Sequence, residues 1–158
     1  MARDILFKAK RIDNGEWVRG GTIVQFLDGG VRSFFIPQFN ETCICEHDEI
    51  TDDILSFSDC RFYKVDGNTL CQYTGLTDKN GNKIWENDVV KYKNADGIKF
   101  NGTTLTVIGK VVYNEKTASF AVYGKDEIGG KHCDYFPIKN VEVIGNIFDN
   151  PELLEGGA

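Results

Sequence analysis

The segment that most constrains the fold runs from Gln72 to Val90 and reads QYTGLTDKNGNKIWENDVV. Its Asn80-Gly81 pair is a strong hairpin signal, because both residue types tolerate the positive φ angles of a type I′ turn. The residues on either side have the composition of β-strands. We therefore expect two antiparallel strands joined by a tight turn, and no residue of the segment is an obvious catalyst.

The same alternation of short strands and turns extends along the chain. Eleven Phe, six Tyr and two Trp against three Pro favour strands over helices. The expected strands cover residues 5–10, 17–19, 22–27, 31–36, 61–65, 69–73, 88–93, 103–113 and 118–123, with a strand pair within 135–148. Residues 124–131 are rich in glycine and charge and are expected to form a loop. The fold class is mainly β.

With 158 residues, the chain has room for one compact domain or two small β units. We expect an amino-terminal antiparallel β region over residues 1–68 and a small barrel over residues 69–155, which can form one compact unit. The acidic segment near residues 46–57 suggests a short helix over Thr51–Phe57, with Thr51 as its N-cap. Asn150 followed by Pro151 predicts a helical turn that closes the barrel.

The net charge of −6 and the pI of about 4.9 argue against broad, sequence-independent binding to nucleic acid, although a local basic face stays open. No apolar run approaches the ~20 residues of a membrane helix, and the first residues lack the apolar core of a signal peptide. We expect a cytoplasmic protein without a membrane partner. Five cysteines, an odd number, are read as free thiols.

A zinc site is the sharpest chemical hypothesis. Thiolates and imidazole suit zinc, and Cys43, Cys45 and His47 lie close together in sequence, with Cys60 or the His132-Cys133 pair as further ligands. The spacing argues against it, because Cys-x-Cys is less diagnostic than Cys-x-x-Cys and alternate residues of a strand share a face in any case. Buried or free thiols are the favoured interpretation, and no cofactor is expected.

Other catalytic or ligand patterns fail on spacing. Asp78–Asn82 lacks the glycine and acid positions of a calcium loop. Cys133 and His132 are neighbours in an expected strand and point to opposite faces, so the histidine cannot readily activate the thiol. Glu86 and Asp88 are better explained by turn capping than by paired-carboxylate catalysis. No catalytic residue is assigned, and a metal-dependent enzyme is the least favoured alternative.

One strand offers a candidate interaction surface. In residues 88–93, Val90 and Tyr92 share one face and Lys91 and Lys93 the other. The candidate surface comprises Lys91, Tyr92, Lys93 and Phe100, and the nearby Lys99 and Lys110 add positive charge. Single-stranded nucleic acid stacks on such aromatic residues in small barrels, whereas core packing explains the same aromatics equally well.

Three blocks of the sequence, residues 5–20, 72–90 and 142–154, resemble the YopX-like family of phage and prophage proteins of Gram-positive bacteria, whose function is not established. The resemblance implies a phage or prophage origin and an SH3-like barrel in the carboxy-terminal half, and it brings no catalytic residue. This sequence departs from the family pattern at Cys71 and Asn87, two positions at which the family commonly has glycine. Asn tolerates the left-handed conformation, so the turn at Asn87 need not change.

The favoured function is that of a non-enzymatic phage accessory protein that binds other proteins. Its partner would be a host or phage protein, and a homo-oligomer is conceivable because strand edges are easily shared. A nucleic-acid-associated barrel is the alternative.

Overall fold

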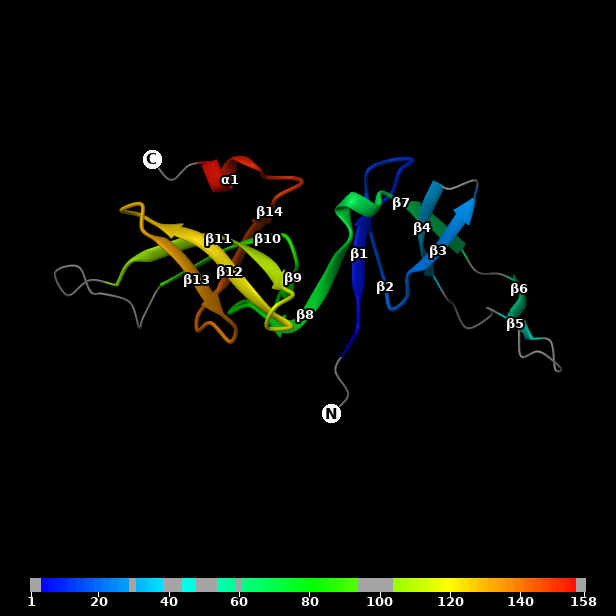
Figure 1. Cartoon of the computed structure of the whole chain (residues 1–158), viewed down its shortest axis with the longest axis horizontal. Helices are drawn as coiled ribbons and strands as arrows, with labels where there is room; N and C mark the ends of the chain where they lie inside the picture. The colour runs from blue at the N-terminus through cyan, green and yellow to red at the C-terminus, as the bar shows by residue number, and fades with distance from the viewer. Residues whose placement is uncertain are drawn as a thin grey trace. The chain divides into compact units, whose positions relative to one another are not determined.

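The computed structural model describes residues 4–28, 31–38, 44–47, 54–58, 61–93 and 104–155. These residues are mainly β and their strands pair antiparallel, which confirms the expected fold class (Figure 1). They fall into two compact units, an amino-terminal unit of Asp4–Leu70 and a carboxy-terminal unit that begins at Cys71. No helix in the described ranges has the length and apolar character needed to cross a membrane.

The amino-terminal unit contains small antiparallel elements. β1 (Phe7–Lys10) pairs with β2 (Trp17–Gly20), and β4 (Val31–Gln38) lies between β3 (Val24–Asp28) and β7 (Arg61–Val65). A 3-10 turn, η1 (Gly67–Thr69), follows β7. The core of the unit is formed by Ala9, Val18, Ile36 and Val65.

A further strand pair replaces the helix expected over Thr51–Phe57. β5 (Ile44–His47) pairs with β6 (Ile54–Ser58), so the helical interpretation is wrong for residues 54–57, and residues 51–53 lie outside the described ranges. The physical reason is that residues 54–58, ILSFS, have a partner strand in β5, and pairing overrides a capping signal worth about 1 kcal/mol.

The carboxy-terminal unit contains one hairpin and one five-stranded sheet. β8 (Cys71–Thr77) pairs with β9 (Lys83–Trp85). The sheet has the order β13-β12-β11-β10-β14. Its strands are β10 (Asp88–Lys93), β11 (Thr106–Asn114), β12 (Ser119–Asp126), β13 (Lys131–Tyr135) and β14 (Glu142–Asn146). The predicted helical turn is present as α1 (Glu152–Glu155), which contacts β11.

The β8–β9 hairpin is present, but its turn differs from the expected type. Gly81 has a φ of 83°, whereas Asn80 does not have the positive φ that a type I′ turn requires. The Asp78 carboxylate sets the turn instead: Oδ1 accepts hydrogen bonds from the backbone N–H groups of Asn80 and Asn82, both at 2.8 Å. The Asn-Gly pair therefore locates the hairpin but does not decide its geometry.

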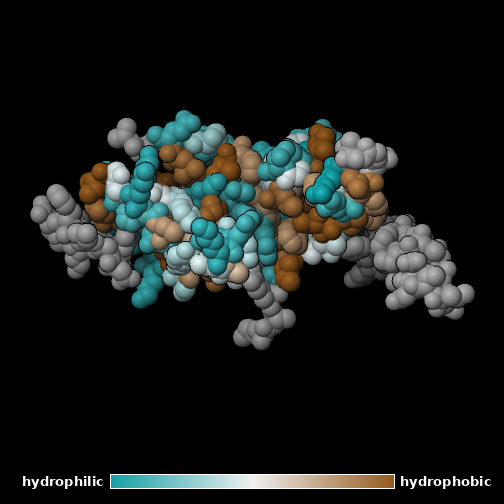
Figure 2. Space-filling view, viewed as in Figure 1, coloured by the Kyte–Doolittle hydropathy of each residue, from teal (hydrophilic) through white to brown (hydrophobic). Residues whose placement is uncertain are grey.

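The two faces of the sheet differ in burial. The inner face packs a core of eight buried residues: Ile84, Val90, Tyr92, Val107, Val111, Phe120, Val122 and Val141. Residues at alternate positions point to the outer face, and much of the visible side of the unit is hydrophilic (Figure 2). α1 covers part of the outer face, because a Cβ atom added at Gly145 would lie 2.7 Å from the Leu153 Cδ1 atom.

β12 and β13 extend into the segment expected to be a loop. β12 continues to Asp126 and β13 begins at Lys131, so only residues 127–130 form the turn. The Asp126 carboxylate closes this turn by accepting hydrogen bonds from the backbone N–H groups of Ile128, at 3.0 Å, and Gly130, at 2.6 Å. β13 and β14 are the two edge strands of the five-stranded sheet, and closure of the sheet into an SH3-like barrel stays a prediction.

Candidate anion-binding face

The outer face of the five-stranded sheet carries the candidate site. One row across the strands consists of Lys91, Ile108, Lys125 and Lys131, which are register partners from β10 to β13. The neighbouring rows add Lys93 beyond Lys91 on β10 and Lys110 opposite Tyr123. Residues two apart along a strand are about 7 Å apart and point to the same face. We call the five residues Lys91, Lys93, Lys110, Lys125 and Lys131 the lysine face.

None of the five ammonium groups makes an ion pair with a carboxylate of the described residues. Elsewhere in the unit, the Lys79 Nζ atom lies 2.6 Å from Glu142 Oε2, whereas Lys116 and Lys139 also make no ion pair with a described carboxylate. The chain carries 24 acidic side chains against 18 lysines and arginines, so partners for surface lysines are abundant. The lysine face is therefore a cluster of five lysines without ion pairs to the described carboxylates, in an acidic protein.

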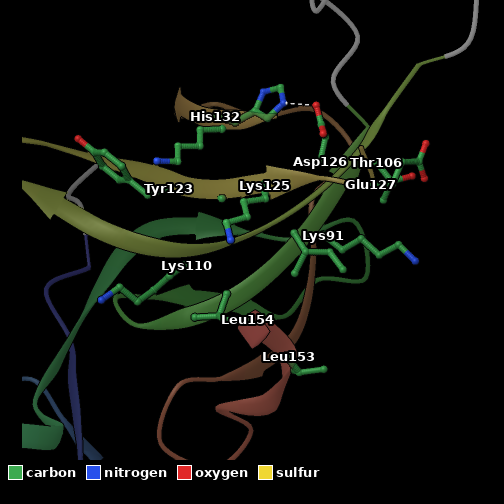
Figure 3. A pocket seen from close by; sticks show the side chains of 13 residues that line it. Lys91, Thr106, Lys110, Tyr123, Lys125, Asp126, Glu127, His132, Leu153 and Leu154 are labelled. Atoms are coloured by element: carbon green, nitrogen blue, oxygen red, sulfur yellow. Dashed lines mark hydrogen bonds and ion pairs between the residues drawn. The ribbon is translucent and has the colours of Figure 1, made fainter. Parts of the chain in front are cut away.

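A groove of about 670 Å³ lies on this face. Its sides are formed by residues of β10 to β13 and by Leu153 and Leu154 of α1. Figure 3 shows the side chains of Lys110, Lys125 and Lys91 in succession on the sheet side, and the two leucines on the other. The lining includes four lysines and two acidic residues, Asp126 and Glu127. The groove thus combines an apolar wall with a wall in which cations outnumber carboxylates, a combination that favours an anionic ligand with apolar parts.

A chain of polar groups on the inner side supports the strands that carry these lysines. The His132 Nε2 atom lies 2.9 Å from Asp126 Oδ2, and its Nδ1 atom lies 3.7 Å from Asp134 Oδ2. The Tyr92 hydroxyl donates a hydrogen bond to Asp134. Because Asp126 and His132 flank the β12–β13 turn, this chain fixes the hairpin on which Lys125 and Lys131 lie.

The pKa values in this chain follow from the contacts. The hydrogen bond from His132 lowers the pKa of Asp126 below its usual value, against an opposing effect of burial. Burial and the hydrogen bond to Asp134 raise the pKa of Tyr92. Asp126 is therefore a carboxylate and Tyr92 a neutral phenol at neutral pH, which suits a structural role for both.

The predicted surface residues are separated by the structure. Lys91 and Lys93 are exposed on the lysine face, whereas Tyr92 is 4% exposed and lies in the inner core, so Tyr92 cannot contact a ligand on that face. Phe100 and Lys99 lie outside the described residues. Lys110 belongs to the face, as its alternation with Val111 requires.

The sequence analysis did not identify two residues of the lysine face, Lys125 and Lys131, or the two tyrosines on the same side of the sheet, Tyr123 and Tyr135. The sequence signal for them is an alternation of side chains along β13, which continues the alternation of β12 after a four-residue turn. Lys131, Cys133 and Tyr135 lie on one face of β13, and His132 and Asp134 lie on the other.

The predicted metal ligands are not brought together in the described residues. Cys43 and Cys60 lie outside them, and Cys45 and His47 belong to β5, described here by its backbone pairing alone. His132 faces Asp126, whereas Cys133 is an exposed free thiol. Within the described ranges, no group of three or more His, Cys, Asp or Glu side chains is arranged to hold a metal ion.

The acidic residues around the β8–β9 hairpin hold the backbone. Besides its turn contacts, the Asp78 Oδ2 atom accepts a hydrogen bond from the Val143 N–H group at 3.1 Å. Asp88 Oδ2 accepts one from the Trp85 N–H group at 2.8 Å. Asn87 has a φ of 65°, the left-handed conformation that its residue type tolerates. These residues have the structural role that the turn interpretation gave them.

A second hollow, of about 510 Å³, lies in the amino-terminal unit between Arg11, Trp17, Arg61 and other side chains. Here the main cation is already neutralised: Arg11 forms an ion pair with Asp13 and lies 3.9 Å from Glu16. Arg61, which also lines this hollow, makes no ion pair with a described carboxylate. The hollow therefore has one such cation, against the five of the lysine face.

Comparison with known proteins gives a family match and similar solved structures. Residues 34–155 match the sequence model of the family described as YopX protein. No curated protein matches the chain significantly. Among solved structures, the crystal structure of protein EF1440 from Enterococcus faecalis is similar, with 19% sequence identity and a TM-score of 0.44, over 97% of this chain and 99% of that chain.

Proposed function

This chain belongs to the YopX protein family, and we propose that it is a non-enzymatic binding module that recognises an anionic macromolecule through the lysine face. The observation that carries the proposal is the cluster of five lysines, without ion pairs to described residues, on one face of a sheet in a chain of net charge −6. A charged patch of this kind attracts an oppositely charged partner and orients its approach.

The register of the sheet supports a functional origin of the cluster. Lys125 and Lys131 are direct cross-strand partners, and like charges in that position destabilise a sheet. Lys110 and Lys91 lie one and two strands away from Lys125. Acidic residues border the cluster, since Glu142 of β14 is the register partner of Lys91 and Glu127 lines the groove, but none lies between Lys125 and Lys131.

The chemistry of the described residues supports binding rather than catalysis. His132 interacts with the Asp126 carboxylate, and the exposed thiol of Cys133 lies on the opposite face of β13. The carboxylates of Asp78 and Asp88 accept backbone hydrogen bonds. The groups that could act as acid, base or nucleophile thus have structural partners or lie apart.

The proposal also includes an accessory role in a phage or prophage, a cytoplasmic location and a barrel of the SH3-like type. The first two rest on the family resemblance and on the composition. The barrel is supported by the strand order, because four strands follow one another as a meander and β14 returns to the side of β10.

The proposal is tested with two anionic polymers, a fluorescent 12-nucleotide oligothymidylate and a fluorescent poly-glutamate peptide. We expect the full chain to bind at least one of them in fluorescence anisotropy, and the Lys125→Glu/Lys131→Glu variant to lose at least tenfold in affinity. The control Lys116→Glu/Lys139→Glu changes the same number of exposed charges outside the face and should retain binding. Binding of neither polymer, or equal losses in both variants, contradicts the proposal. Light scattering of the same samples checks the homo-oligomer, which stays a prediction.

A further inference from the structure

Two tyrosines lie on the lysine face. Tyr123 of β12 and Tyr135 of β13 are each 46% exposed. Tyr123 is opposite Cys133 in the register, and Tyr135 is two residues farther along the same strand, so the two rings are diagonal neighbours.

Both hydroxyl groups are held by one amide. The Asn114 Nδ2 atom lies 3.4 Å from the Tyr123 hydroxyl and 3.0 Å from the Tyr135 hydroxyl. Each ring is therefore fixed at both ends, by its strand and by Asn114, while much of its surface stays in contact with water. Fixed and exposed rings stack on a planar ligand at a small cost in side-chain entropy.

The tyrosines occupy two successive rows beside the row of Lys125 and Lys131: Tyr123 lies in the next row and Tyr135 in the row after it. Tyr123 is the register partner of Lys110, and the row beside it contains Lys125 and Lys131. A ligand that lies across these rows meets planar rings and ammonium groups from positions whose backbones are about 7 Å apart along a strand. The matching ligand has planar apolar groups and negative charges in regular alternation along one chain.

Single-stranded nucleic acid has this alternation, whereas an acidic peptide has the charge without regularly spaced planar groups. In a duplex, the base faces are stacked on one another and are not available to the tyrosine rings. All the cations of the face are lysines, which contact phosphate as point charges rather than as a planar bidentate fork. Such contacts do not read the base sequence.

We propose that the lysine face binds single-stranded nucleic acid without strong sequence preference, with bases stacked on Tyr123 and Tyr135 and phosphates beside Lys110, Lys125 and Lys131. The inference rests on the proposed function and names the partner of the same face. The apolar wall of Leu153 and Leu154 lines the other side of the groove.

The experiment compares three ligands with three forms of the full chain. The ligands are the labelled 12-nucleotide oligothymidylate, a duplex of the same length and the poly-glutamate peptide. The forms are the wild type, Tyr123→Ala/Tyr135→Ala, and Tyr123→Phe/Tyr135→Phe, which keeps both rings. We expect the single strand to bind tighter than the duplex, the alanine variant to lose at least about fivefold per ring for the single strand, and the phenylalanine variant to lose less than threefold.

The poly-glutamate peptide separates the inference from the proposed function. If the peptide binds through the lysines while the oligonucleotide does not, the inference is overturned and the proposed function stands. Equal affinity for single strand and duplex, or an alanine variant that binds like the wild type, also overturns the inference. If Lys125→Glu/Lys131→Glu leaves the binding of every ligand unchanged, both fail. Thermal unfolding of each variant, and Tyr113→Ala as a control tyrosine outside the face, show whether a loss comes from misfolding.

Discussion

Lys125 and Lys131 are direct register partners on β12 and β13, and their side chains leave the same face of the sheet. Neither makes an ion pair with a described carboxylate, although Asp126 at the end of β12 and Glu127 in the turn lie between them in sequence. Asp126 is instead 6% exposed and is directed to His132 and the turn backbone. The hairpin therefore keeps Asp126 inside, while Glu127 and the two lysines are exposed.

This pairing predicts that one charge reversal stabilises the protein. Lys131→Glu replaces a repulsive cross-strand pair by an attractive one, so the free energy of unfolding should rise by about 0.5 kcal/mol at low salt. Urea unfolding measures the change. Lys139→Glu, an exposed lysine of a turn, is the control and should show no such gain. A lower free energy of unfolding in Lys131→Glu contradicts the account of the pair.

The salt dependence of oligonucleotide binding should report the number of phosphate contacts. If Lys91, Lys110, Lys125 and Lys131 each neutralise one phosphate, the slope of log K against log salt is roughly −3, at about −0.7 per contact. Lys125→Glu/Lys131→Glu should reduce the magnitude of the slope to about 1.4 or less. A slope near zero in the wild type would show that the contacts are not ionic.

Tyr92 should matter for stability and not for binding. Tyr92→Phe removes the hydrogen bond to Asp134 but keeps the ring in the core, so the free energy of unfolding should fall by about 1 kcal/mol. Affinity for the oligonucleotide should stay within a factor of two. Tyr113→Phe, a change at a 43% exposed tyrosine, should leave both quantities unchanged. If Tyr92→Phe lowered the affinity without lowering the stability, Tyr92 would belong to the binding surface, contrary to this prediction.

Asp78 should make stability dependent on pH in the acid range. Burial acts to raise its pKa, but the hydrogen bonds from Val143, Asn82 and Asn80 outweigh burial, so the pKa is lower in the folded than in the unfolded state. The carboxylate therefore contributes its full stability above pH ~4, and the contribution is lost as the pH falls through the folded-state pKa.

The corresponding variant is Asp78→Asn. We expect a loss of about 1 to 3 kcal/mol at pH 7, since buried N–H groups lose a charged acceptor, and a smaller further loss between pH 5 and pH 3 than in the wild type. Glu115→Gln, in an exposed turn, serves as the control in the same urea titrations. Identical acid profiles for Asp78→Asn and the wild type would assign the acid sensitivity to other groups.

Gly109 and Gly124 face each other across β11 and β12 at a very close approach. A Cβ atom at Gly124 would lie 2.4 Å from the Ile108 carbonyl oxygen and 2.7 Å from the Gly109 Cα atom. Gly124→Ala must separate the strands and should cost about 1 to 3 kcal/mol in chemical unfolding. At Gly21 the nearest atom would be 3.7 Å away, so Gly21→Ala is a suitable control. An undisturbed Gly124→Ala variant would show that the strands separate easily.

The parts of the fold set by local pattern were predictable. The alternation of Val90 and Tyr92 with Lys91 and Lys93 placed each residue of β10 on its correct face, and Asn150-Pro151 located the turn of helix at the end. These features depend on neighbours in sequence. The extent of β12 and β13 was not predictable in the same way, because residues 124–131 have the glycine and charge of a loop and become ordered through pairing with other strands.

The candidate site depended on that pairing. Lys91 and Lys110 could be placed on one face from their own strands, but Lys125 and Lys131 joined them only once the β12–β13 register was known. The turn type at Asn80-Gly81 was wrong for a related reason, since the buried carboxylate of Asp78 determines it. Contacts that a local sequence pattern does not reveal thus decided the composition of the lysine face and the type of the turn at Asn80-Gly81.

The most direct test of the lysine face as the binding surface is chemical-shift mapping by NMR. A ¹⁵N-labelled full chain is titrated with the 12-nucleotide oligothymidylate, and backbone amide shifts are followed residue by residue. The account predicts that the largest changes lie at Ile108, Lys110, Tyr123, Lys125 and Lys131, with small changes in Asp4–Leu70. Changes concentrated in Asp4–Leu70, or no changes at saturating oligonucleotide, would contradict it.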